Sequence, residues 1–562
     1  MQNTDKIHIQ HLAEICAQKG MKQVVLSPGS RCAPLVIAFN RHPDLECFSI
    51  VDERSAAFFA LGLAQQSGLP VGLICTSGSA VLNYAPAVAE AFYQKIPLVL
   101  LTADRPNEWI DQGENQSIQQ FEVFKNYIKK SYQLPVNVVS KEDIWYCDRL
   151  ISEAINTSSF PDFGPVHINI PLREPLYNLV DVSEPVKPKI VKALASQMIF
   201  SEDDKKEITT DWHASNKKLI IVGLGVYKQE LNDLLQQISL QKDTVILYES
   251  ISNIKVENAF GQIDPLVEII EKKNLQDFIP DVVLTFGAGI VSKKLKFWLR
   301  KAQVAKHWHL SNSFEHWDNL QALSKVINLK PETFLSYLLD TKVNKESTYF
   351  GLWQNLNTEV RTFTKDYLKA APYSDFNVFK VLMNSFPENA NIHFGNSTPV
   401  RYSNLLALKN QFVNANRGVS GIDGQVSTAL GASNLHKKMT ICITGDLALM
   451  YDSNALWNNY LHPNFKVILI NNDGGNIFRI IPGPNKLEEL ETYFETKNTY
   501  EAEYLAKLHH LKYFKAVGLV ELESVLNVFY EEKDAPALLE IKTDGAVSAK
   551  VLSEYFQKLL VK

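Results

Sequence analysis

Short runs of consecutive apolar residues recur along the chain, and stretches with helical spacing separate them. In the N-terminal third these runs cover residues 24–26, 71–75, 98–101 and 166–170. Uninterrupted apolar strands that alternate with helices are typical of parallel sheets, because such sheets are buried on both faces. The pattern therefore predicts an α/β domain with a parallel sheet in the first part of the chain.

The same pattern occurs twice more along the chain. A stretch with prolines and lysines at residues 184–189 is expected to be a linker, and a polar, helix-prone segment covers about 330–375. Between and after them, apolar runs lie at residues 219–222, 244–247, 282–286, 439–444, 465–470 and 537–541. The predicted fold class is thus α/β, with three consecutive doubly wound parallel-sheet domains at 1–183, 190–335 and 375–562.

Two Gly-x-Gly turns follow strands of the second block, at residues 223–225 and 287–289. A dinucleotide-binding motif needs the full G-x-G-x-x-G spacing, which neither turn has. We therefore interpret both as packing turns, with a nucleotide site as the alternative.

Composition excludes several classes of protein. The 562 residues are 46% hydrophobic and 21% charged, which is ordinary for a globular protein with several cores. The net charge of −5 gives no general attraction to nucleic acid or anionic membranes. No apolar run reaches membrane-spanning length and the N-terminus lacks a signal-peptide pattern, so a cytoplasmic protein without integral membrane contact is expected. The six scattered cysteines disfavour a disulfide framework or a zinc site.

Two polar turns follow apolar runs of the third block. Asp446 lies in residues 445–447 (GDL), and Asn472 lies in residues 471–475 (NNDGG). Open parallel sheets bind ligands at the carboxyl ends of their strands, where an Asp and an Asn can share a hard cation such as Mg²⁺. Each turn alone fits an ordinary helix cap. Together, with the helix-like stretch 452–460 between them, they resemble the diphosphate–Mg²⁺ signature of thiamine diphosphate enzymes.

Glu53 stands in residues 52–57 (DERSAA), where a strand end meets an apolar helix. By itself it fits a carboxylate that complements the helix dipole. In thiamine diphosphate enzymes, however, a Glu before a small-residue-rich helix and a Thr-Ser-Gly turn binds the aminopyrimidine ring and activates the cofactor. Residues 76–80 (TSGSA) resemble that turn, so Glu53 is the candidate catalytic carboxylate.

Four arginines stand in turns that are rich in Gly, Ser, Pro or Asn. The guanidinium fork is the preferred planar partner of a carboxylate. Several such groups at sheet edges therefore indicate substrates with more than one carboxylate, although any single arginine could instead brace a loop. The four are Arg31, Arg105, Arg401 and Arg417.

These segments, with 115–116, 416–424, 445–451 and 471–478, resemble the MenD family, the 2-succinyl-5-enolpyruvyl-6-hydroxy-3-cyclohexene-1-carboxylate (SEPHCHC) synthases of menaquinone biosynthesis. The resemblance implies a pyrimidine-binding, a central and a diphosphate-binding domain of the thiamine diphosphate-dependent enzyme type. It implies decarboxylation of 2-oxoglutarate with thiamine diphosphate and Mg²⁺, or Mn²⁺. A 1,4-addition of the succinic semialdehyde carbanion to isochorismate would follow, giving SEPHCHC and CO₂. It further implies a homodimer or dimer of dimers with the active site at the subunit interface.

The resemblance also assigns roles to single residues. Glu53 is implied as the catalytic group that activates the pyrimidine ring, and Ile422 as the apolar prop of the bent cofactor. The implied metal ligands are Asp446, Asn472 and the Gly474 carbonyl, and the other implied cofactor-binding positions are Ser77, Gly78, Asn476 and Ile477. The implied substrate-binding positions are Ser30, Arg31, Arg105, Gln116, Lys293, Lys294, Ser397, Arg401, Arg417 and Phe478.

Several alternatives stay open at this point. The Lys293–Lys294 pair could be a solvated helix face. The protein could be another thiamine diphosphate-dependent 2-oxoacid decarboxylase or carboligase, which the four loop arginines disfavour. It could also be a non-catalytic thiamine diphosphate-binding protein, which the joint presence of Glu53, Asp446 and Asn472 disfavours. The charged segment 485–499 is a candidate lid.

Overall fold

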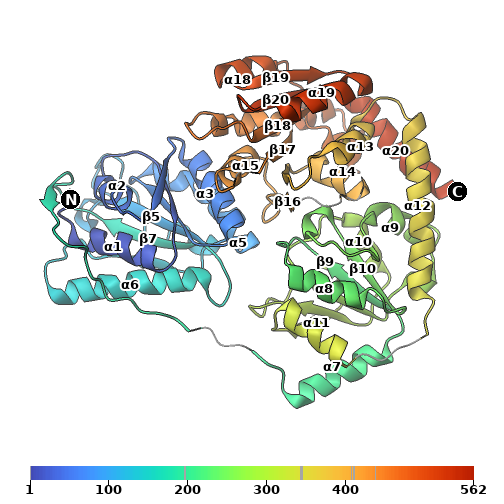
Figure 1. Ribbon diagram of the computed structural model, residues 1–562, viewed down its shortest axis with the longest axis horizontal. Coiled ribbons are helices and arrows are strands. Elements are labelled where there is room, and N and C mark those ends of the chain that lie inside the picture. Colours follow the sequence, from blue (N-terminus) through green and yellow to red (C-terminus); the bar gives the residue numbers. More distant parts are fainter. Residues whose placement is uncertain are drawn as a thin grey trace. The chain divides into compact units, whose positions relative to one another are not determined.

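The computed structural model describes residues 2–194, 198–341, 346–406, 408, 412–436 and 438–561. These residues form three six-stranded sheets and one two-stranded sheet, with helices between the strands (Figure 1). The predicted α/β class with three parallel sheets is confirmed. By their contacts the residues group into two compact units: one of Met1–Ser196, Asn416–Thr440 and Ala448–Phe465, the other of Gln197–Ala415, Ile441–Leu447 and Lys466–Lys562. The three domain bounds stay a prediction.

The first sheet belongs to the first unit, and all its strand pairs are parallel. Its order is β3 (Glu46–Ser49), β2 (Gln23–Leu26), β4 (Val71–Cys75), β5 (Leu98–Asp104), β7 (Val166–Pro171) and β6 (Ser131–Gln133). One face of the sheet is covered by three helices, α1 (Ile7–Gln18), α2 (Ala33–Asn40) and α6 (Lys141–Ser159), which enclose a core with it. Helix α3 (Glu53–Ser67) also packs on the sheet, and α5 (Ala85–Gln94) packs against α3. This sheet is therefore doubly wound.

A further helix of the first unit, α15 (Gln425–Ser433), crosses α3 at very short range. A Cβ atom on Gly62 of α3 would lie 2.0 Å from the Thr428 carbonyl oxygen, and one on Gly431 of α15 would lie 2.0 Å from that of Phe59. Glycine at both positions lets the two helix backbones touch. Helix α15 is thereby fixed to the helix that begins at Glu53.

The second sheet belongs to the second unit, and its strands are again parallel. Its order is β11 (Ala259–Phe260), β10 (Thr244–Tyr248), β9 (Lys218–Val222), β12 (Val282–Phe286), β13 (His307–Leu310) and β14 (Leu323–Ile327). A Cβ on Gly223 would lie 2.0 Å from the Ala288 carbonyl oxygen. The two Gly-x-Gly turns therefore meet each other, as packing turns do.

The third sheet has the order β16 (Phe412–Asn414), β15 (Asn391–Phe394), β17 (Thr440–Gly445), β18 (Phe465–Asn471), β20 (Ala537–Lys542) and β19 (Lys512–Ala516). β17 and β18 are the two strands that precede the polar turns of Asp446 and Asn472. The stretch 452–460, expected to be helix-like, holds only the short 3-10 helix Ser453–Leu456.

The polar segment between the second and third sheets contains α12 (Tyr349–Ala370), the longest helix of the described chain. α12 packs against β10 and α9 (Ile263–Lys272) and also against α20 (Gly545–Val561). Trp353 is fully buried on it, and the Tyr367 hydroxyl donates to the Val551 carbonyl at 2.7 Å. Among the described residues, no helix is both long and apolar enough to cross a bilayer.

Candidate functional site

Glu53 is the first residue of α3, and its position is set by the cap before it. The Asp52 carboxylate accepts hydrogen bonds from the backbone amides of Arg54 and Ser55, at 2.9 and 3.2 Å. Glu53 itself is half-buried, and its Oε2 atom accepts a hydrogen bond of 3.4 Å from the Asn83 side chain. Asn83 was not predicted, because an Asn at the end of a short helix carries no local signal of such a contact.

The two residues that flank Glu53 both form hydrogen bonds with the segment 451–454, which belongs to the same unit. The second oxygen of Asp52 accepts from the Asn454 amide at 2.6 Å. Arg54 donates to the Tyr451 carbonyl at 2.7 Å, and its guanidinium lies 4.8 Å from the centre of the Tyr451 ring. Residue 53 therefore stands between two anchored side chains, which restricts where its carboxylate can point.

The turns after β2 and β4 meet, and Gln116 lies against the turn after β4. A Cβ on Gly29 would lie 2.3 Å from Cβ of Thr76, so the two turns are in direct contact. Gly78 has a φ of +86°, and a Cβ there would lie 3.0 Å from the backbone of Gln116. The structure thus brings together three segments predicted for the site, with Ser77 buried and Ser30 exposed.

Gln120 supports the turn that contains Gly78, and the sequence pattern did not predict this role. Its side-chain oxygen accepts from the Gly78 amide at 3.3 Å, while its Nε2 atom donates to the Ala103 carbonyl and to Asn169, at 2.9 and 2.8 Å. It is 1% exposed. A buried glutamine between two strand ends gives no pattern in the sequence that would distinguish it from a surface residue.

Arg31 and Arg105 lie close to each other in the first unit. Arg31 donates to the Leu172 carbonyl at 3.0 Å and pairs with Glu174 at 3.3 Å. Arg105 donates to the Asn115 carbonyl at 3.0 Å and pairs with Glu114 at 3.3 Å. Burial and then the positive charge of Arg105 lower the pKa of Arg31 from its ordinary value. Two neighbouring guanidinium groups are suited to an anion that carries two negative charges.

The segment 416–424 carries Arg417 and Ile422. Arg417 is half-buried, and Ile422 is 36% exposed although it is apolar. The segment begins at the buried Asn416, whose amide donates to the Thr428 hydroxyl at 3.0 Å. It ends at Gly424, where a Cβ would lie 2.0 Å from the ring of Phe58 in α3.

In the second unit, Asp446 reaches the turn that follows β18. Its carboxylate, 2% exposed, accepts from the Gly474 amide at 2.6 Å and from the Leu447 amide at 2.7 Å. Tyr500 donates to the Asp446 carbonyl at 2.8 Å. The Asn472 side chain donates to the buried Asp375 at 2.9 Å, which fixes the amide nitrogen and leaves its oxygen as the candidate ligand.

The electrostatics of this turn fit a cation. The pKa of Asp446 is raised to about 6, chiefly by burial and also by the charge of Asp473, while amide hydrogen bonds oppose the rise. Among the described residues, the Oδ1 atom of the buried Asn476 has no hydrogen-bond donor. A divalent ion would stabilise the charged form of Asp446. Within the described residues no cluster of three or more His, Cys, Asp or Glu side chains could hold a metal. The predicted ligand set contains one carboxylate, so it stays a prediction.

A cleft of about 930 Å³ in the second unit collects several predicted substrate residues. It is lined from α9, α10 (Lys293–Lys301), α14 (Thr398–Leu406), α17 (Ile477–Ile480) and α20. Of the predicted residues it contains Lys293, Lys294, Arg401 and Ile477. Phe478 is not among its lining and instead packs against Phe494, with ring centres 5.5 Å apart.

The basic residues of this cleft differ in their charge compensation. Lys294 pairs with Glu268 and lies 4.4 Å from the centre of the Phe556 ring. Lys293 is exposed and has no ion-pair partner in the described part of the chain. Arg401 donates to the carbonyl of Ser397 at 2.6 Å, and Ser397 itself has a φ of +72°. Lys293 is therefore the cation of the pair whose charge is available to a ligand.

Arg479 lines the same cleft and was not predicted. It forms ion pairs with Glu495 and with Glu491, the latter at 2.7 Å. The Gly475 amide donates to the Glu495 carbonyl at 2.7 Å. These contacts fix part of the candidate lid 485–499 to the turn that follows Asn472.

Comparisons with known proteins agree with this architecture. The N-terminal TPP-binding domain of thiamine pyrophosphate enzymes matches residues 9–123. The 2-succinyl-5-enolpyruvyl-6-hydroxy-3-cyclohexene-1-carboxylate synthase of Flavobacterium johnsoniae is 41% identical over 555 residues, which cover 98% of this chain and 98% of that protein. The chain belongs to the SEPHCHC synthase family. The family prediction is confirmed, and with it the class, a thiamine diphosphate-dependent transferase.

Two further SEPHCHC synthases extend the comparison. The protein of Flavobacterium psychrophilum is 40% identical, with 98% of each chain covered. That of Porphyromonas gingivalis is 38% identical, covering 98% of this chain and 97% of its own. The crystal structure of benzoylformate decarboxylase from Polynucleobacter necessarius superposes with a TM-score of 0.72 at 15% identity, over 96% of this chain and 98% of that one. At that identity the likeness shows the fold.

Proposed function

We propose that the protein is a SEPHCHC synthase that uses thiamine diphosphate and Mg²⁺, or Mn²⁺ in its place. It would decarboxylate 2-oxoglutarate and transfer the remaining four-carbon unit to isochorismate by 1,4-addition, with release of CO₂. The observation that carries the proposal is the 41% identity to a named synthase over 98% of both chains. We assign three tasks of this reaction to the residues described above.

The first task is to hold the cofactor, which supplies the decarboxylation and carbon–carbon bond chemistry when bound. Asp446, the oxygen of Asn472 and the carbonyl of Gly474 would hold the cation that binds its diphosphate. Ser77, Gly78, Asn476 and Ile477 are proposed to contact the cofactor, and Ile422 to support it. The exposed apolar side chain of Ile422 fits that role, since a bound molecule would cover it.

The second task is proton control, which we assign to Glu53. Its carboxylate would hold a proton at a ring nitrogen of the aminopyrimidine. The cap of Asp52 and the anchored Arg54 would orient it, and the Asn83 amide is positioned to keep one carboxylate oxygen in place. The other oxygen is then available to the ring.

The third task is to bind substrates that carry two carboxylates each. Arg31 and Arg105 in one unit, and Lys293 and Arg401 in the other, are cationic groups suited to it. Binding a substrate carboxylate would replace the present partners Glu174 and Glu114. The remaining proposed contacts are Ser30, Gln116, Lys294, Ser397, Arg417 and Phe478. We further propose a homodimer or dimer of dimers with the active site at the subunit interface.

The proposal is tested with the purified protein, thiamine diphosphate, Mg²⁺ and 2-oxoglutarate, with and without isochorismate. Stoichiometric CO₂ release and loss of isochorismate would support the synthase. CO₂ release that is indifferent to isochorismate would indicate a decarboxylase or another acceptor. No CO₂ release from a protein with bound cofactor would contradict the proposal. Light scattering of the same sample gives the oligomeric state.

A further inference from the structure

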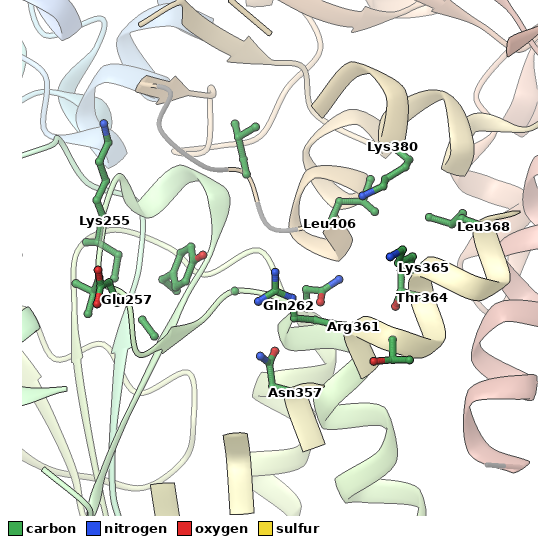
Figure 2. A pocket seen from close by; sticks show the side chains of 17 residues that line it. Lys255, Glu257, Gln262, Asn357, Arg361, Thr364, Lys365, Leu368, Lys380 and Leu406 are labelled. Carbon is green, nitrogen blue, oxygen red and sulfur yellow. The ribbon is translucent and has the colours of Figure 1, made fainter. Parts of the chain in front are cut away.

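A second cavity of the second unit contains none of the residues assigned to the proposed reaction. Its volume is about 600 Å³. It lies between the β10–β11 edge of the second sheet, helix α12, helix α13 (Asp375–Ser385) and the end of α14 (Figure 2). Its walls combine apolar side chains such as Val256 and Leu368 with a group of basic ones.

Three of the basic side chains come from two helices. Arg361 and Lys365 lie one turn apart on α12, and Lys380 comes from α13 (Figure 2). Within the part of the chain that the structure describes, none of the three forms an ion pair with a carboxylate. Like charges at this helical spacing disfavour each other, so the arrangement is one that an anion would stabilise.

The other charged side chains of the cavity do not cancel the positive charge of these three residues. Its lining holds one carboxylate, Glu257, and a fourth cation, Lys255. The ammonium of Lys255 lies 5.3 Å from the ring centres of both Tyr227 and Phe412, which do not line the cavity, so it points away from the other three cations (Figure 2). Four cations and one carboxylate give the lining a net charge of +3 (4 − 1).

A buried acceptor sits among the cations. Gln262 is 6% exposed, and its Nε2 atom donates to the Leu405 carbonyl at 2.6 Å. Its Oε1 atom is buried and has no donor among the residues that the structure describes. Unpaired buried acceptors are rare in native proteins, because leaving them without a donor is unfavourable. A ligand that brings a hydroxyl group would satisfy this atom.

Tyr248 completes this part of the wall. Its ring lies against Gly261, where a Cβ would approach the ring to 2.7 Å, so only glycine permits the contact. Arg361 is close enough to oppose the rise that burial produces in the pKa of the Tyr248 hydroxyl. A phenol and a guanidinium thus line the same cavity, both able to donate to an anion.

We propose that this cavity binds a small, hydroxyl-bearing multivalent anion, of the class of sugar phosphates or hydroxy-polycarboxylates. Its anionic groups would contact Arg361, Lys365 and Lys380, and a hydroxyl would donate to Gln262. The apolar wall would cover the carbon skeleton. Both subclasses present the same chemistry to the cavity, and the experiment below separates them.

Two helices connect this cavity to the cleft with the proposed substrate residues. Leu406 at the end of α14 lines the cavity, and Arg401 on the same helix lines the cleft. Gln262 directly precedes α9, whose Glu268 pairs with Lys294 in the cleft. Occupancy of the cavity is therefore expected to change the KM for substrate, a consequence that rests on the proposed function.

Binding is measured by calorimetry on the full chain, saturated with thiamine diphosphate and Mg²⁺. The probes are fructose 1,6-bisphosphate for phosphate esters and tartrate for hydroxy-carboxylates. We expect one of them to bind, and the double variant Arg361→Gln/Lys365→Gln to weaken that binding at least about tenfold. The matched control is Lys369→Gln, since Lys369 is exposed on the same helix, pairs with Asp366 and does not line the cavity.

Each outcome decides the proposal. Binding that is weakened in the double variant and kept in the control supports the site, and the probe that binds names the subclass. No binding of either probe at millimolar concentration, or equal binding by the double variant, overturns it. A bound probe that leaves the KM unchanged overturns only the coupling. A protein without synthase activity refutes the proposed function, while the calorimetry still decides the site.

Discussion

The Glu90 carboxylate accepts a hydrogen bond of 2.5 Å from the backbone amide of Gly418. It also accepts from the amides of Val419 and Ser420, at 2.7 and 3.3 Å, and is itself 1% exposed on α5. A Cβ on residue 418 would lie 2.6 Å from the Glu90 carbonyl oxygen, so glycine is required there. A buried carboxylate thus fixes the segment that carries Arg417 and Ile422.

The first prediction concerns this carboxylate. The variant Glu90→Gln replaces one of two acceptor oxygens by a donor that faces backbone N–H groups. We expect a loss of about 1–3 kcal/mol in the free energy of unfolding, the cost of unpaired buried donors. Because Arg417 and Ile422 move with the segment, the KM for 2-oxoglutarate and the Kd for thiamine diphosphate should rise more than kcat falls.

Urea unfolding and steady-state kinetics measure these effects. The control is Glu359→Gln, which changes an exposed carboxylate on α12. Stability and KM equal to those of the control would refute the positioning role of Glu90. A fall in kcat alone would assign Glu90 to another step.

The second prediction concerns the crossing of α3 and α15. A methyl group at residue 62 or 431 would meet a backbone carbonyl oxygen at 2.0 Å, so the helices must separate. We expect Gly62→Ala and Gly431→Ala each to lower the free energy of unfolding by about 1–3 kcal/mol. Gly351→Ala is the control, because nothing lies within 4 Å of a Cβ at that position in α12.

The control should instead gain about 0.4–1 kcal/mol, since alanine restricts the unfolded chain and favours helix. The urea midpoints of the three variants decide the prediction. If all three variants shift in the same direction, the helix crossing is not the constraint that the geometry indicates.

The third prediction concerns the cation. Asp446→Asn removes the charge of the proposed ligand but keeps its shape and its acceptor for the Gly474 amide. We expect the variant to fold, and to need at least about tenfold more Mg²⁺ for half-maximal cofactor binding. Removal of divalent ions by chelation should abolish turnover of the unmodified protein, and Mg²⁺ or Mn²⁺ should restore it. Cofactor binding followed by fluorescence against metal concentration gives the result; an unchanged metal requirement would exclude Asp446 as a ligand.

The fourth prediction concerns Glu53. Glu53→Gln keeps the size of the side chain and its contact with Asn83, but it removes the group that would hold the proton. Turnover should fall about 10²–10⁴-fold, the usual range for a lost acid–base group, while cofactor binding and unfolding stay close to the original values. CO₂ release is the measurement, with the exposed Glu46→Gln as the control. Retained turnover would remove Glu53 from the proposed mechanism.

The strands that the sequence predicted best are the central ones. Val71–Cys75 and Val282–Phe286 are buried along their whole length, and their uninterrupted apolar runs follow from that burial. The missed strands lie toward sheet edges and carry polar side chains. His307 and His309 alternate along β13, and both side chains hydrogen-bond to the Thr285 hydroxyl on the neighbouring strand. In the sequence alone, these polar residues resemble a loop.

In the candidate site, too, local sequence indicates some features and not others. Turns such as those of Asp446 and Gly78 could be predicted, because their residues adjoin strands in the sequence. Glu90 could not, since its amide partners lie 328 to 330 positions away and a Glu inside a helix looks like a surface residue. The cavity around Arg361 was equally hidden, because its cations come from segments that only folding brings together.

The last prediction concerns Asp452, which is fully buried beside the first turn of α15 and directly precedes the 3-10 helix Ser453–Leu456. Its carboxylate accepts from the backbone amide and the hydroxyl of Ser427, at 2.8 and 2.7 Å. Burial raises its pKa from 3.8 to about 7, and these hydrogen bonds only partly oppose the rise. Between those two values the folded state holds a proton that the unfolded state has lost, so the contribution of Asp452 to stability falls as pH rises.

The expected slope for this one group is about 1.4 kcal/mol per pH unit within that window. Asp452→Asn has no proton to lose, so its free energy of unfolding relative to the original protein should increase as pH rises from 5 to 7. Urea unfolding of both proteins across this range provides the difference. A difference that is independent of pH would show that Asp452 is already ionised in the folded protein, held by Ser427 and the nearby Arg54.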